Sequence, residues 1–215
     1  MSNKITVLFD GYSYKSEDNG KTIYKANCSS TLIKSKEGQY ILVDTLTPWD
    51  SGILLELLSK EGVSKDDIKV IVCTHGHSDH IGNNNLFPNL ETLIVGQTVS
   101  YKDNYELEVD FDKGFSISED INVLGTPGHT LECSTVIVKN SNLGNCVCIT
   151  GDLFEKEEDI IDESIWIEAG SSNENEQRRN RYKIASIADY IIPGHGKGFK
   201  VTNEIVKTLE KQIKD

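Results

Sequence analysis

All five histidines of this 215-residue chain lie in three short segments, and these segments predict a metal-binding site. They read Thr-His-Gly-His-Ser-Asp-His at 74–80, Pro-Gly-His-Thr at 127–130 and Pro-Gly-His-Gly at 193–196. A further pair, Gly151-Asp152, adds a carboxylate after an apolar run. Imidazole is the usual nitrogen ligand of catalytic zinc, and carboxylates often complete such sites. The predicted metal ligands are His75, His77, Asp79, His80, His129, Asp152 and His195.

The spacing within residues 75–80 predicts two metal ions. In a tight loop after a strand, alternate side chains point in opposing directions, so His75 and His77 are predicted to bind one ion. Asp79 and His80 then bind its neighbour, and Asp152 bridges the two. Each ion keeps an open position for water, which is typical of catalytic sites. The nitrogen-rich ligand set favours two Zn²⁺ per chain, with iron or manganese as alternatives.

Short apolar runs bounded by turn residues predict the strands that position these ligands. The predicted strands are 5–9, 30–33, 40–43, 69–73, 92–95, 121–124, 134–138, 146–149 and 190–192. Helical spacing of apolar residues predicts helices at 51–60, 174–188 and 203–214, with a short helix after His80. The acidic, serine-rich stretch 155–175 is predicted to be a surface loop or lid, mobile in part. The order predicts an α+β fold with two sheets and outer helices in a single domain, 1–215.

Composition and charge restrict the setting of the protein. With 37% hydrophobic residues the chain suits one globular domain, and a net charge of −12 argues against a broad nucleic-acid or membrane footprint. A local basic cleft remains open as an alternative. No segment approaches the roughly 18–20 apolar residues of a membrane span. The N-terminal apolar run is too short for a signal peptide, and the five cysteines lack disulfide or zinc-finger spacing, which predicts a cytosolic protein.

The four ligand segments resemble those of the metallo-β-lactamase superfamily, over roughly residues 31–199. This resemblance implies a four-layer αβ/βα sandwich with its metals at one sheet edge. Where the family often has Asp-Thr-Gly, this chain has Asp44-Thr45-Leu46. The resemblance implies that Asp44 orients a ligand and does not bind metal itself. Histidine at position 77, where the di-iron flavoprotein branch has glutamate, argues against that branch.

Flanking residues give a closer resemblance, to a small one-domain group within the glyoxalase II-like members of this superfamily. The residues that carry it are 74–88 (THGHSDHIGNNNLFP), 151–155 (GDLFE) and 188–199 (ADYIIPGHGKGF). This group is described as endoribonucleases acting on histone pre-mRNA. The resemblance therefore implies RNA as the substrate, a homodimer, and a cytosolic location that extends to the nucleus.

The predicted chemistry is hydrolysis by a hydroxide that bridges the two metals, with Asp79 as a catalytic residue that orients it. Lys197 and the basic cluster Arg178, Arg179, Arg181 and Lys183 are candidate phosphate contacts, although the cluster also fits a solvated helix face. Trp166 and Tyr182 are candidates for stacking a base, lining an acyl pocket or packing in the core.

Two substrate classes stay open: RNA, and a small thioester or ester of the glyoxalase II type. The absence of a histidine beyond the ligand set favours a leaving group that departs unprotonated, such as a thiolate. A non-catalytic binding protein is a third hypothesis, and the complete ligand set argues against it.

Overall fold

Two mixed β-sheets lie face to face, and the predicted apolar runs form most of their strands. The computed structural model describes residues 2–214. In order across the first sheet, the strands are β1 (Lys4–Phe9), β4 (Ser30–Lys34), β5 (Tyr40–Val43), β6 (Ile68–Cys73), β7 (Thr92–Val95), β8 (Thr98–Tyr101) and β9 (Asn104–Glu106). Across the second they are β10 (Phe115–Ser118), β11 (Ile121–Gly125), β12 (Ser134–Lys139), β13 (Cys146–Gly151), β14 (Tyr190–Pro193) and β15 (Phe199–Lys200).

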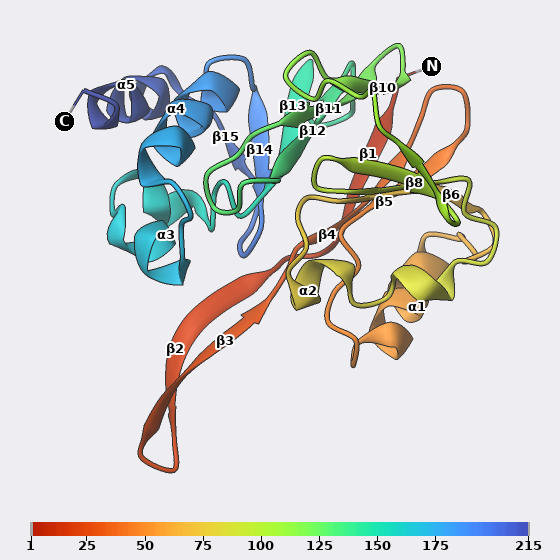
Figure 1. Cartoon of the computed structure of the whole chain (residues 1–215), viewed down its shortest axis with the longest axis horizontal. Coiled ribbons are helices and arrows are strands. Elements are labelled where there is room, and N and C mark those ends of the chain that lie inside the picture. The colour runs from red at the N-terminus through yellow and green to blue at the C-terminus, as the bar shows by residue number, and fades with distance from the viewer. Residues whose placement is uncertain (1, 215) are drawn as a thin grey trace.

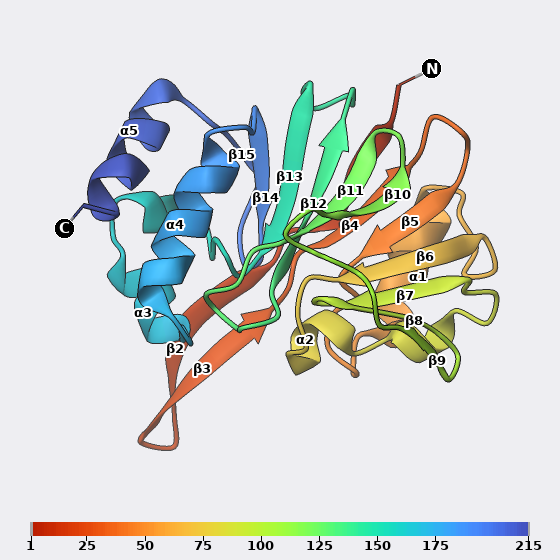
Figure 2. The ribbon, with the colours of Figure 1, turned by 45° about the horizontal axis from the view of Figure 1, so that its top comes forward.

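The helices cover the outer faces of the two sheets, which gives the predicted four layers. Figure 2 shows α1 (Ser51–Lys60) on one side of the molecule and α4 (Glu174–Ala185) with α5 (Asn203–Gln212) on the other. The alternation of side chains along β6 explains this arrangement. Val70 and Val72 join the core between the sheets, whereas Ile71 packs in the cluster beneath α1. No helix within residues 2–214 is long and apolar enough to cross a membrane.

Four strands that carry predicted ligands end at the same edge of the sandwich. The strands β5 and β6 are parallel, and so are β13 and β14. The strand β11 is antiparallel to β12, which is antiparallel to β13, so β11 runs in the same direction as β13. Because residues that follow parallel strands emerge at one edge, the loops after β6, β11, β13 and β14 converge there.

A long hairpin, β2 (Tyr12–Asp18) and β3 (Lys21–Asn27), was not predicted from the sequence. Figure 1 shows it projecting far from the body of the molecule. Most of its side chains are exposed and polar, so it lacks the apolar alternation on which strands were predicted. The usable signal was Asn19-Gly20, whose positive φ angles of 49° and 73° form the tight turn.

The prediction of a surface loop over 155–175 is wrong in its secondary structure. The segment contains a 3₁₀ turn at Glu157–Ile160 and the helix α3 (Ser164–Ala169). Asp159 and Trp166 are fully buried in it. The reason is a long-range ion pair, because Arg181 of α4 lies against Asp159 with Nη2 2.6 Å from Oδ1. An acidic composition alone does not reveal such a partner.

The predicted short helix after His80 is present as a 3₁₀ helix at Asn84–Leu86, and a further single-turn helix lies just before it. The helix α2 covers Ser78–Ile81, so it contains Asp79 and His80 and does not follow them. The predicted helices at 174 and 203 start as expected, with side-chain caps from Asn173 and Thr202. They end at Ala185 and Gln212, a few residues before the predicted ends.

Candidate metal centre

The structure brings all seven predicted ligands together at the shared sheet edge. His75 and His77 follow β6, His129 follows β11, Asp152 follows β13 and His195 follows β14. Asp79 and His80 project from the single turn of α2. Glycine is required at two positions beside the ligands. A Cβ at Gly151 would collide with Thr74, and a Cβ at Gly194 would collide with the Asp152 carboxylate.

The first group of ligand atoms comes from His75, His77, His129 and Asp152. These atoms all lie within 4.8 Å of one another. His129 Nε2 is 3.1 Å from His77 Nδ1 and 3.4 Å from Asp152 Oδ2. Three nitrogens and one carboxylate oxygen at this spacing match the first of the two predicted ions.

The second group comes from Asp79, His80 and His195, again with all atoms within 4.8 Å. Asp152 also reaches this group, with Oδ1 3.2 Å from His80 Nε2 and Oδ2 3.2 Å from His195 Nε2. The Asp152 carboxylate therefore lies between the two groups. The structure assigns His129 to the first group and His195 to the second, which the sequence left open.

Buried polar atoms without partners show that the cluster fits metal ions. His75 Nε2, His80 Nε2 and Asp152 Oδ1 are buried and form no hydrogen bond with any described residue. Leaving such an atom unpaired costs on the order of 1–3 kcal/mol. His80 Nε2 lies 3.2 Å from Asp152 Oδ1, and His75 Nε2 lies 3.5 Å from Asp152 Oδ2. Divalent cations between these atoms would satisfy all three of them together. The cluster is therefore a His/Asp metal-binding site.

The charges within the cluster support this assignment. Burial by itself would raise the pKa of Asp152, but His195, His80 and His75 outweigh burial and hold that pKa well below its usual range. Burial would lower the pKa of His195, yet the Asp152 carboxylate raises it to about 9. Burial lowers the pKa of His75 well below normal. A deprotonated carboxylate that attracts positive charge is the environment that a divalent cation needs.

The outer nitrogens of three imidazoles are held by groups outside the cluster. His80 Nδ1 lies 2.9 Å from Asp44 Oδ2, His195 Nδ1 lies 3.0 Å from Asn27 O, and His129 Nδ1 lies 2.6 Å from Gly170 O. These contacts direct each Nε2 toward the centre. Asp44 thus occupies the position that an orienting residue requires. Asn27 and Gly170 were not predicted, because a backbone acceptor leaves no signal in side-chain type.

The loop after β5 carries leucine at the position where the resembled motif often has glycine. Asp44 and Leu46 have φ angles of 57° and 60°, and Leu46 is fully buried. Asp44 Oδ1 accepts a hydrogen bond from Thr74 N at 2.7 Å, which ties this loop to the segment that carries His75. A bulky residue in the left-handed region is strained, so packing must hold it there.

We expect Asp44→Asn to weaken zinc affinity about 10- to 100-fold, because the neutral amide orients His80 less well and loses the carboxylate charge. Competition with a chromophoric chelator measures this affinity. Asp67→Asn is the matched control. The Asp67 carboxylate also accepts a backbone hydrogen bond, from Ser64 N, but it lies on the surface. Equal zinc affinities in both variants would contradict the orienting role.

The cations predicted to contact substrate have different surroundings. Arg178 Nε lies 2.8 Å from Glu163 Oε1, and its contacts are with Glu163, Glu174 and Trp166 and with none of the seven ligands. Arg181 is fully buried against Asp159, so its prediction as part of a solvated or phosphate-binding face is wrong. Trp166 is buried and unavailable for base stacking.

Lys197 is exposed and lines a cavity of about 340 Å³ together with His195.

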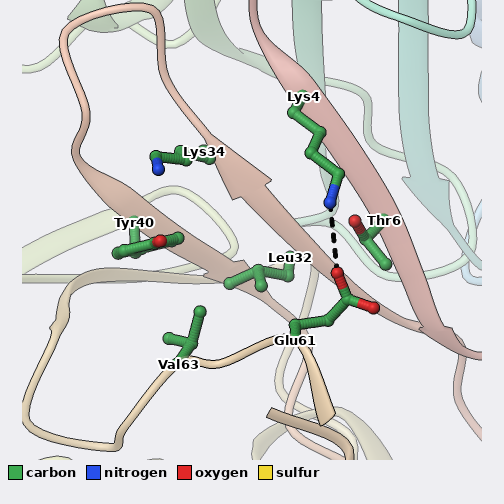
Figure 3. A pocket seen from close by; sticks show the side chains of 7 residues that line it. All are labelled: Lys4, Thr6, Leu32, Lys34, Tyr40, Glu61 and Val63. Atoms are coloured by element: carbon green, nitrogen blue, oxygen red, sulfur yellow. Dashed lines mark hydrogen bonds and ion pairs between the residues drawn. The ribbon is translucent and has the colours of Figure 1, made fainter. Parts of the chain in front are cut away.

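A second hollow, shown in Figure 3, lies away from the ligands. It has a volume of about 130 Å³ and lies between β1, β4, β5 and the end of α1. Lys4 Nζ and Glu61 Oε2 form an ion pair across it at 3.2 Å. None of its lining residues belongs to the metal cluster, and this exposed pair contributes little to stability.

Comparisons with known proteins agree with this geometry. Residues 23–195 match the family model described as the Metallo-beta-lactamase superfamily. A Xenopus laevis protein, "Metallo-beta-lactamase domain-containing protein 1", is 37% identical over 203 residues, which cover 93% of this chain and 82% of that protein.

Solved structures share the fold at low sequence identity. A Thermotoga maritima protein described as a metallo-beta-lactamase superposes with a TM-score of 0.66 at 19% identity, covering 93% of this chain and 100% of that one. AidC, described as a dizinc quorum-quenching lactonase with a bound product, superposes with a TM-score of 0.60 at 19% identity. The superposition covers 81% of this chain and 74% of AidC.

Proposed function

Because this chain belongs to the metallo-β-lactamase superfamily, we propose that it is a hydrolase that uses two divalent metal ions. Zinc is the metal that we propose for both positions. The observation that carries the proposal is a pair of ligand groups that share the Asp152 carboxylate. His75, His77 and His129 would hold one ion. Asp79, His80 and His195 would hold the other, with Asp152 reaching both. Two bound metal ions of this kind would supply Lewis acidity and a water-derived nucleophile at neutral pH.

The residues around the cluster have distinct tasks in this proposal. Asp79 is partly exposed, with Oδ2 3.9 Å from His80 Nε2 and 3.8 Å from His195 Nε2. We assign its second oxygen to orient the attacking water. His77 is exposed whereas His75 is buried, so substrate enters from the side of His77. Asp44, Asn27 and Gly170 hold the imidazoles in place, which keeps the site preorganised.

For the substrate we propose a phosphodiester of single-stranded RNA, of the histone pre-mRNA kind that the sequence resemblance implies. Lys197 supports this proposal, because it is an exposed cation in the cavity that also reaches His195. The homodimer and the cytosolic or nuclear location implied by the same resemblance stay predictions.

A small thioester or ester is the second candidate, and specific observations favour it. Arg178 and Arg181 are both neutralised by carboxylates of this chain, which removes two predicted phosphate contacts. The net charge of −12 opposes a polyanion, and no histidine outside the cluster can protonate an alkoxide leaving group.

The test is hydrolysis of labelled single-stranded RNA by the zinc-loaded protein, with a glutathione thioester in parallel and His75→Ala as the control. RNA cleavage that is lost in the variant would support the first candidate. Thioester cleavage alone would assign the protein to the second. Activity of His75→Ala equal to that of the wild type on both substrates would contradict the metal-dependent site itself.

We expect Lys197→Ala to slow RNA cleavage about tenfold, since one charge-assisted contact to a phosphate is lost. Cleavage of a neutral thioester should stay unchanged. Initial rates on both substrates measure the effect, and Lys207→Ala is the matched control because Lys207 is exposed on the distant helix α5. Equal losses on RNA and thioester would argue against a phosphate contact.

A further inference from the structure

The β2–β3 hairpin carries exposed aromatic and basic side chains in a chain that is otherwise strongly acidic. Between residues 12 and 27 there are three lysines and two acidic residues, whereas the chain as a whole has a net charge of −12. Tyr12 is 41% exposed and Tyr14 is 50% exposed. The two rings are adjacent, and a contiguous exposed apolar patch, unlike a single exposed ring, marks a contact site.

The register of the hairpin separates its two faces. Ser13 and Lys15 point to the body of the protein, where Ser13 Oγ donates to Glu155 Oε2 at 3.1 Å and Lys15 Nζ pairs with Glu168 at 2.5 Å. Tyr12 and Tyr14 lie on the opposite face, because side chains alternate along a strand. Lys25 pairs with Tyr14 across the strands and so lies on the same face. This face leaves its aromatic rings open to solvent.

One cavity beside β2 is lined by residues of both the open face and the metal cluster. That cavity is lined by Tyr12, by His195 of the metal cluster, and by the cations Lys156 and Lys197. Glu157 and Glu158 line it as well, so its charge is balanced. The Tyr12 and Tyr14 rings lie 5.8 Å apart, centroid to centroid, which extends the row of rings away from the cavity. A ligand in this cavity would contact Lys197 and Tyr12, and Tyr14 lies next to Tyr12 on the open face.

We infer that this hairpin face binds the single-stranded RNA that flanks the cleaved phosphodiester, with bases stacked on Tyr12 and Tyr14 and a phosphate near Lys25. The inference rests on the proposed function, whose substrate it extends. Aromatic rings alternating with cations are the usual way to hold single strands without sequence preference, since every base has a face that can stack. A second protein on the same face is the competing occupant, and the cavity that Tyr12 shares with His195, Lys156 and Lys197 favours RNA.

The test is equilibrium binding of the zinc-loaded protein to a fluorescein-labelled, phosphorothioate-linked oligouridine of about 15 nucleotides, which resists hydrolysis. We expect Tyr12→Ala/Tyr14→Ala to weaken binding at least about tenfold, because two stacking contacts are lost. Tyr12→Phe/Tyr14→Phe should bind like the wild type, since the rings remain. The matched control is Tyr101→Ala/Tyr105→Ala, because those tyrosines are 45% and 62% exposed at the far edge of the first sheet.

Hydrolysis of bis(p-nitrophenyl) phosphate, which has no flanking nucleotides, reports on the metal centre separately. It should be unchanged in all of these variants, and this also shows that they fold. Equal RNA affinities of the alanine variant and the wild type would overturn the inference while leaving RNA cleavage intact. Failure of the wild type to bind RNA would overturn it as well, and thioester cleavage by that same protein would show that the proposed substrate had failed too.

Discussion

Replacement of Asp152 by asparagine is expected to slow hydrolysis about a thousandfold or more, because Lewis-acid catalysis worth several kcal/mol depends on it. Its two carboxylate oxygens lie 3.2–3.5 Å from the Nε2 atoms of His75, His80, His129 and His195. An amide at this position removes the charge that balances both ligand groups. Metal content should fall from two ions per chain to one or fewer, as measured by mass spectrometry of the purified protein.

The control for Asp152 is Asp120→Asn. Asp120 is also a buried carboxylate, but it pairs with Lys36 at 2.8 Å away from the metal ligands. This variant tests whether the loss of any buried acid has the same effect. Full metal content and full activity in Asp152→Asn would contradict the shared-carboxylate site.

The second large effect is on stability, at Arg181. We expect Arg181→Met to lower the free energy of unfolding by about 3–5 kcal/mol, because it leaves the buried charge of Asp159 uncompensated. The Arg181 guanidinium also donates to Leu153 O at 2.9 Å, in the residue next to Asp152, and Asp159 Oδ2 accepts from Glu155 N at 2.7 Å. Urea denaturation followed by circular dichroism measures the change.

Two further variants separate the causes. Arg179→Ala, on the exposed face of the same helix, should change stability by less than about 0.5 kcal/mol. The double variant Arg181→Met/Asp159→Leu should recover much of the loss, since an apolar pair replaces the ion pair without leaving a buried charge. A single variant as stable as the wild type would show that the pair does not hold this segment.

The sequence predicted most of the fold because the evidence for it is local. Apolar runs of strand length and capped amphipathic helices form where their own residues favour them, and each predicted strand lies within a residue or two of an observed one. The hairpin was missed because its exposed strands bury too little apolar surface to leave a pattern. The ligand cluster was predictable for a related reason, since histidines and aspartates placed just after strands are brought together whenever those strands share an edge.

The tertiary structure decided what long-range contacts control. It placed His129 with His75 and His77, and it placed His195 with Asp79 and His80, through loops that are far apart in the sequence. It buried Arg181 against Asp159 and turned a predicted surface loop into packed helices. It also supplied Asn27 O and Gly170 O as partners of the imidazoles. These outcomes depend on partners tens of residues away, and the free energy of pairing a buried charge or a backbone acceptor exists only once the fold has brought the two groups together.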